Sequence, residues 1–243
     1  PEILPTGICT YEHVVANVPH EKMVEKSVEV RGLKTTVSTI DIPCSFGPAY
    51  EGERVRGADL YMQMGGGKTQ ATELVKRAEM NEIDDGKVNI DGPDITDIKE
   101  GENLPIGIHV QVAGREFQTD FEPIIERQIH HLINYIQGVM HIGQRDIAWI
   151  RVSKAAVEKG FTLKDIGVVL HAKFHQDFGN ILDKVQVNLI TDKAKVDKLT
   201  KQARAEYKMR DERVEKMRDE DVETYYSCTL CQSFAPTHVC TVR

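Results

Sequence analysis

Three of the five cysteines lie within the last sixteen residues, at Cys228, Cys231 and Cys240. Two thiols three positions apart can turn toward one metal centre, and Pro236 favours a loop that brings the third thiol back to it. Thiolates at this density suit zinc or an iron–sulfur cluster, both of which usually take four ligands. The tail therefore predicts a metal site with three of its ligands on these residues. A zinc knuckle and three free thiols are the alternatives.

Two further motifs have the residue types of a binding site without its full pattern. The run Gly65-Gly66-Gly67-Lys68-Thr69 lacks the spacing of a phosphate-binding loop and precedes a strand-like stretch, so we interpret it as a turn. His171 and His175 are four positions apart on a predicted helix, as in a metal-binding pair. Because no third ligand is evident nearby, we interpret them as surface or packing histidines.

The composition is that of an ordinary globular protein. Of 243 residues, 40% are hydrophobic and 28% are charged, and the net charge is −7. Nucleic acids and anionic membranes attract basic surfaces, so neither is expected as the main partner. No run reaches about eighteen apolar residues, so no transmembrane helix is expected, and no signal peptide is visible. The odd number of cysteines, gathered at one end, does not resemble a secreted disulfide framework, and we expect a reducing cytoplasm.

Alternating and β-branched stretches predict strands through the middle of the chain. The expected strands span residues 35–42, 60–64, 73–79, 87–91, 106–113, 147–152 and 185–190. Apolar residues at helical spacing predict helices over about 19–31 and 121–137. Strands and helices interleave irregularly, so we expect a mixed α/β fold of the α+β type. A central mixed-sheet domain with flanking helices would be followed by a long charged helix leading into the cysteine-rich loop.

Two further helices have start signals. Thr162 and Asp165 have the spacing of a capping box, which begins a helix that reaches about Phe178. Thr191-Asp192 can cap a last helix that reaches about Glu220. Most of the surface of this last helix is charged and must be wet, with one sparse apolar stripe. We interpret it as a bridge between domains, and a partner-docking helix is the alternative.

The residue order of the tail is more specific than its spacing. The stretch from Tyr225 to Cys240 resembles the cluster-binding segment of acetyl-CoA synthase. In that family the segment belongs to the subunit of the carbon monoxide dehydrogenase/acetyl-CoA synthase complex that carries a nickel–iron–sulfur cluster. Other stretches are similar to the family's central domain, so the resemblance covers nearly the whole chain. They are Ile42-Pro43, Phe46–Glu53, Leu104–Ile108, Asp120–Pro123, Gln144–Asp146, Trp149–Arg151 and Asp183–Val187.

The resemblance implies a chemistry for the tail. Cys228, Cys231 and Cys240 match cysteines that ligate a [4Fe–4S] cluster, and the match of Cys231 also bridges to the nearer of two nickel ions. Thiolate is a soft ligand that iron and nickel both accept. Phe234 is a candidate for shielding the bound substrate. The family's fourth cluster cysteine and the ligands of its distal nickel are absent from these 243 residues, so we expect no acetyl transfer from them alone.

The resemblance also implies an activity and partners. The family condenses CO, a corrinoid-bound methyl group and coenzyme A to acetyl-CoA. Its implied partners are carbon monoxide dehydrogenase, the corrinoid iron–sulfur protein, ferredoxin and coenzyme A. Residues 1–34 resemble the end of an N-terminal domain, 35–200 a central domain and 201–243 the start of the cluster domain. A binding module for coenzyme A or a redox partner, and a zinc-site interaction protein, are the alternative functions.

Trp149 and Arg151 should share one face of a strand, because side chains alternate along it. An indole can stack on adenine, and guanidinium groups bind phosphate. The central domain of the family is implicated in coenzyme A binding, so we expect Trp149, Arg151 and the nearby Arg145 to contact coenzyme A. The alternative is a core tryptophan with both arginines in salt bridges.

Overall fold

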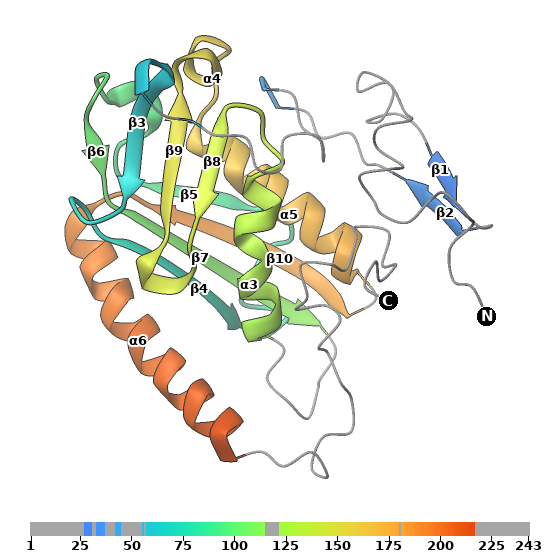
Figure 1. The fold of residues 1–243 in the computed structure, drawn as a ribbon. Helices are drawn as coiled ribbons and strands as arrows, with labels where there is room; N and C mark the ends of the chain where they lie inside the picture. The colour runs from blue at the N-terminus through green and yellow to red at the C-terminus, as the bar shows by residue number, and fades with distance from the viewer. Residues whose placement is uncertain are drawn as a thin grey trace.

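The computed structural model describes residues 27–30, 33–36, 42–44, 55, 57–114, 122–179 and 181–216. In these ranges, two four-stranded mixed sheets lie together with the helices that pack on them (Figure 1), and residues of both sheets contribute to one large hydrophobic core. The expected α+β fold with a mixed-sheet body and flanking helices is confirmed. No helix in the described ranges combines the length and hydropathy needed to cross a bilayer.

The first sheet has the strand order β4-β7-β10-β5. Its strands are β4 (Ala71–Arg77), β7 (Ile106–Gly114), β10 (Leu182–Ile190) and β5 (Val88–Asp91). β7 is parallel to β4 and antiparallel to β10, which is parallel to β5. Val185, Val187 and Leu189 alternate along β10 and are fully buried, so one face of this sheet points into the core.

The second sheet has the order β6-β3-β9-β8. Its strands are β6 (Asn103–Leu104), β3 (Leu60–Gly65), β9 (Trp149–Ser153) and β8 (Val139–Ile142). β3 is parallel to β6 and antiparallel to β9, which is antiparallel to β8. Met62, Met64, Ile150 and Val152 are buried in the core, so the residues between them on β3 and β9 lie on the opposite face.

Two helices pack between and beside the sheets. α3 (Glu122–Ile133) contacts β4, β8 and α5, and α5 (Leu163–Phe178) also contacts β10 and β5. The capping box expected at the start of α5 is confirmed, because the backbone N–H and the hydroxyl of Thr162 donate to Asp165 Oδ2 over 2.7 and 3.0 Å. The short helix α4 (Lys154–Glu158) and the 3-10 helices η2 (Gly57–Asp59), η3 (Ile95–Asp97) and η4 (Arg145–Ile147) connect these elements.

The last helix, α6 (Lys193–Lys216), lies along β4 and β7 on the other face of the first sheet (Figure 1). The expected apolar stripe is confirmed from Val196 to Tyr207, which are both buried. The approach is close, because a Cβ added to Gly107 of β7 would lie 2.8 Å from Leu199 Cδ2. Over this length α6 is a packed layer of the domain, with only its outer surface wet.

The chain also contains elements that the sequence did not indicate. β1 (Ser27–Val30) pairs antiparallel with β2 (Leu33–Thr36), so the helix expected over 19–31 is wrong at residues 27–30, and its residues 19–26 and 31 lie outside the described residues. Val28 and Val30 are two positions apart, which is the spacing of one strand face, and the two residues that separate the strands suit a hairpin. The strand expected over 35–42 is confirmed at Thr35–Thr36, and residues 37–41 lie outside the described residues. The short strands β6 and β8 were not expected.

Candidate functional site

The cysteine tail lies outside the described residues. Cys228, Cys231 and Cys240, the predicted metal ligands, and Phe234, the predicted shielding residue, all fall after the last described residue, Lys216. Their ligation therefore stays a prediction that rests on the sequence.

Trp149 and Arg151 are brought together on the outer face of the second sheet. Both belong to β9, both are half-buried, and the guanidinium carbon of Arg151 lies 4.4 Å from the centroid of the indole ring. This is a cation–π contact, which favours a cation near the electron-rich face of the ring. The expectation that the two side chains share a strand face is confirmed.

Among the described residues, Arg151 is held in place by uncharged acceptors. Its Nε donates to Gln63 Oε1 over 2.9 Å, and its Nη1 donates to the carbonyl of Val55 over 3.4 Å. Both acceptors are uncharged, and no carboxylate in the described ranges forms an ion pair with Arg151. The side chain therefore presents a fixed positive charge, which an anionic ligand can use.

A glycine turn lies beside Trp149. Gly65, Gly66 and Gly67 have φ angles of 72°, 82° and 92°, a region that favours glycine. A Cβ on Gly66 would lie 3.2 Å from Trp149 Cβ and 2.4 Å from Gln63 Nε2, so a larger residue would displace this surface. The run is the turn we expected. The next residue, Lys68, is exposed, so the turn carries one positive charge in addition to that of Arg151 on β9.

The third predicted contact, Arg145, faces a different part of the molecule. Its Nη1 and Nη2 donate to the two carboxylate oxygens of Asp211 on α6, each over 2.8 Å. Its Nε lies 3.7 Å from Glu126 Oε1 on α3, and its guanidinium covers the ring of Tyr207 at 4.7 Å. The structure thus places Arg145 in a network with α3 and α6.

Sequence reasoning missed the charged residues buried at the edge of β4. Glu126 and Arg210 are 3% and 5% exposed, and Arg210 Nη1 lies 3.1 Å from Glu126 Oε2. The same carboxylate accepts the backbone N–H of Val75 over 3.0 Å, and Arg210 Nη2 donates to the Val75 carbonyl over 2.7 Å. The pair thereby occupies hydrogen-bonding groups on the outer edge of β4, as a neighbouring strand would. The available signal was that Arg210 continues the buried stripe, three residues after Tyr207.

A second buried pair lies nearby on the same strand. Glu73 of β4 bonds His141 of β8, and both side chains are at most 2% exposed. The hydroxyl of Tyr207 also donates to the Glu73 carbonyl, which covers a further point of the β4 edge. We assign these contacts to the stability of the fold, because they join α6 and both sheets.

The premise that no third ligand lies near His171 and His175 is wrong. Asp85, which precedes β5, lies within hydrogen-bond distance of both rings. The sequence separation between Asp85 and the two histidines hid this arrangement.

Comparison with known proteins identifies the family. The family described as the CO dehydrogenase/acetyl-CoA synthase complex beta subunit matches residues 42–196, which is more than half of the chain. The chain belongs to this family. A second family, described as the C-terminal part of the ACS/CODH beta subunit, matches residues 207–243 and includes the three tail cysteines.

Related proteins support the same family membership. The chain is 51% identical over 223 residues to the carbon monoxide dehydrogenase/acetyl-CoA synthase subunit alpha of Moorella thermoacetica, covering 92% of this chain and 31% of that protein. It is 44% identical over 205 residues to the acetyl-CoA decarbonylase/synthase complex subunit beta of Methanopyrus kandleri, covering 84% of this chain and 44% of that protein. It is 45% identical to the acetyl-CoA decarbonylase/synthase complex subunit beta 1 of Methanocaldococcus jannaschii, covering 91% of this chain and 29% of that protein. The chain spans less than half the length of these family members.

Proposed function

We propose that the chain is part of an acetyl-CoA synthase, which joins CO, a methyl group and coenzyme A to acetyl-CoA. The observation that carries this proposal is the 51% identity with the Moorella protein over 92% of the chain. In this proposal residues 1–34 end an N-terminal domain, 35–200 form the central domain and 201–243 begin the cluster domain. The second boundary falls inside α6, so the helix would connect the two domains while packing on the first.

In this proposal Cys228, Cys231 and Cys240 would hold a [4Fe–4S] cluster, and Cys231 would also be a ligand of one of two nickel ions. The donor set fits, because all three are soft thiolate ligands and a thiolate sulfur can bridge two metals. When bound, the group supplies the metal centre at which CO and the methyl group are activated. Phe234, three residues after Cys231, would shield the bound substrate from water.

The described residues support a coenzyme A contact at β9. Trp149 offers an indole on which the adenine can stack, and Arg151 offers a guanidinium that can bind a phosphate. In the described ranges this guanidinium has no carboxylate partner. Arg145 would have to leave Asp211 before it could reach a phosphate. Of the two arginines, we therefore expect Arg151 to contribute more than Arg145 to the free energy of coenzyme A binding.

The test is coenzyme A binding to the full-length protein, measured by calorimetry. Arg151→Ala removes a charge-assisted hydrogen bond, so coenzyme A should bind about tenfold to a hundredfold more weakly. Arg77→Ala is the matched control, because Arg77 is an exposed arginine at the end of β4 on the other sheet, and its loss should leave the affinity unchanged. Equal coenzyme A affinities for Arg151→Ala and the parent would refute the contact.

The family also suggests partners and a location. We propose carbon monoxide dehydrogenase as the stable partner, with a corrinoid iron–sulfur protein and a ferredoxin as transient ones, in the cytoplasm. The related proteins support this, because their names describe subunits of carbon monoxide dehydrogenase/acetyl-CoA synthase and of the acetyl-CoA decarbonylase/synthase complex. Co-purification of the full-length protein with carbon monoxide dehydrogenase tests the stable contact.

A further inference from the structure

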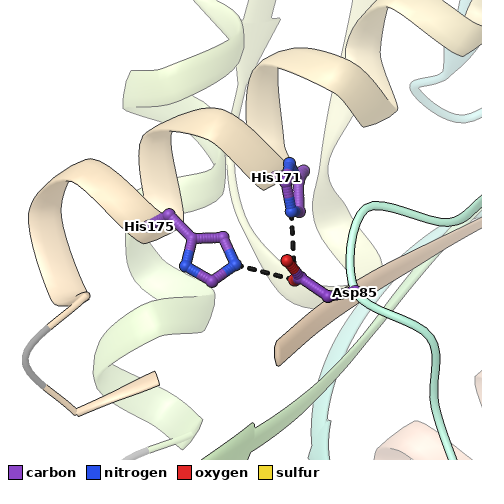
Figure 2. Close-up of side chains that lie close together, drawn as sticks. All are labelled: Asp85, His171 and His175. Atoms are coloured by element: carbon purple, nitrogen blue, oxygen red, sulfur yellow. Dashed lines mark hydrogen bonds and ion pairs between the residues drawn. The ribbon is translucent and has the colours of Figure 1, made fainter. Parts of the chain in front are cut away.

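Asp85, His171 and His175 converge at the surface beside α5, and we refer to them as the Asp–His–His cluster (Figure 2). Asp85 Oδ1 lies 3.1 Å from His171 Nε2 and 2.7 Å from His175 Nε2. One ligand atom from each residue lies within 4.8 Å of the other two. Figure 2 shows both rings reaching from the helix toward the same carboxylate.

The fold fixes each member of the cluster. His171 and His175 are one turn apart on α5, so they lie on the same side of the helix. Asp85 lies in a turn closed by the hydrogen bond from the N–H of Lys87 to the carbonyl of Asp84. Gly86, with a φ of 76°, completes this turn, and its N–H donates to the Val185 carbonyl over 3.0 Å.

The backbone of β10 also orients the carboxylate. Asp85 Oδ1 accepts the N–H of Val185 over 2.9 Å. This places the oxygen in front of α5 whether or not the histidines bond to it. Three segments that are distant in sequence, namely the turn before β5, α5 and the start of β10, therefore meet at the cluster.

The donor set is one that a transition metal uses. Two imidazole nitrogens and one carboxylate oxygen bind Zn²⁺ at about 2.0–2.2 Å, which places neighbouring ligand atoms of a tetrahedron roughly 3.3 Å apart. The two observed separations from Asp85 Oδ1, 2.7 and 3.1 Å, are close to that value, and the two histidine ligand nitrogens lie within 4.8 Å of each other. Mg²⁺ and Ca²⁺ prefer oxygen ligands, so the two nitrogens select against them.

The cluster is open to solvent on one side. The side chains of Asp85, His171 and His175 are 43%, 27% and 28% exposed, so a cation can enter without the domain opening. Three protein ligands leave a fourth position for water. Binding would use the lone pair of each Nε2, with the ring proton on Nδ1.

We propose that the Asp–His–His cluster binds one divalent transition-metal ion of the Zn²⁺ class. The bound ion would tie the turn before β5 to α5. The site is formed entirely by described residues and uses none of the tail cysteines. It is therefore independent of the proposed iron–sulfur chemistry.

The test measures Zn²⁺ binding to the 243-residue chain with Cys228, Cys231 and Cys240 replaced by serine, so that the thiolates of the tail cannot compete. Zn²⁺ is titrated against a chromophoric chelator in this parent, in His175→Gln, in His171→Gln and in Asp85→Asn. Asp84→Asn is the matched control, because it removes the neighbouring carboxylate of the same turn, which pairs with Lys87 instead of a histidine. Circular dichroism checks that every variant is folded.

The parent and Asp84→Asn should bind one Zn²⁺ with the same affinity, whereas each cluster variant should lose at least about tenfold to a hundredfold in affinity. Zn²⁺ should raise the melting temperature of the parent but not of His175→Gln, and excess Mg²⁺ should not replace it. Equal Zn²⁺ affinity in the parent and all three cluster variants would overturn the proposal. So would absence of binding in the parent, which would leave the cluster as a set of hydrogen bonds only.

Discussion

Replacing Arg210 by methionine should destabilise the domain by about 4 kcal/mol at pH 8. Methionine keeps the apolar stem of the side chain but removes both donors. Glu126 then keeps the Val75 N–H at 3.0 Å and the more distant Arg145 at 3.7 Å. A buried carboxylate that loses its partner costs about 3–5 kcal/mol.

The structure gives a similar size for the lost attraction. Two unit charges at the observed 3.1 Å attract each other by about 5 kcal/mol at an effective dielectric constant of about 20. The Val75 carbonyl also loses the donor that lies 2.7 Å away, which adds to the cost. Part of the penalty is relieved because Glu126 can take up a proton.

Because Glu126 can take up a proton, the stability that Arg210→Met costs depends on pH. Burial raises the pKa of Glu126 to about 7, against the lowering effects of the Val75 N–H and of Arg210 and Arg145. Removing Arg210 should raise this pKa further, so the variant gains more than the parent from protonation. The penalty at pH 6 should therefore be about 1 kcal/mol smaller than at pH 8.

Urea unfolding followed by circular dichroism measures these differences. Trp149, the single tryptophan of the chain, gives an independent fluorescence signal for the same transition. Arg204→Met is the matched control, because Arg204 is 63% exposed on the same helix, and its ion pair with Asp146 should contribute less than about 1 kcal/mol. Adding Glu126→Gln to Arg210→Met should recover about 2 kcal/mol, since position 126 then no longer buries an unpaired carboxylate. A penalty below about 1 kcal/mol for Arg210→Met, or no recovery in the double variant, would refute the reasoning.

Three further outcomes are expected. Gly167→Ala should destabilise the domain by about 1–3 kcal/mol in urea unfolding, because the added Cβ would lie 2.4 Å from Val88 Cγ1. This clash should outweigh the higher helix propensity of alanine, and a stabilised variant would contradict the contact. Asp165→Ala should cost about 1 kcal/mol by removing the acceptor of both Thr162 hydrogen bonds, and an unchanged urea midpoint would argue against the capping box. Because the pKa of Glu126 is raised from 4.5 to about 7, the folded state holds more protons between these values. Stability should fall by up to about 3 kcal/mol as the pH rises through this window, and Glu126→Gln should remove that part of the slope.

The elements predicted correctly are those whose pattern is long or carries a start signal. β7 and β10 are nine residues long, with apolar residues at every second position over 106–112 and 185–189, and α5 begins at a capping box. The strand β8 covers only Val139–Ile142, which is too short for periodicity to show. The helix expected over 19–31 fails at β1 because pairing with β2, rather than local spacing, decides the conformation there.

The candidate sites divide in the same way. Trp149 and Arg151 could be placed together because alternation along one strand is a local property. Asp85 could not be joined to His171 because the contact depends on how β5, α5 and β10 pack. Arg210 was counted among the wet charges of α6, because composition does not show that a carboxylate from α3 lies opposite it.

The most direct test of the proposed function is metal analysis of the full-length protein, prepared without oxygen, together with its Cys231→Ser variant. The account predicts iron and sulfide in equal amounts with nickel in the parent. In the variant, nickel should be lost and the cluster signal in electron paramagnetic resonance should change. A parent that contains zinc alone, or neither iron nor nickel, would contradict the assignment of Cys228, Cys231 and Cys240 to the cluster.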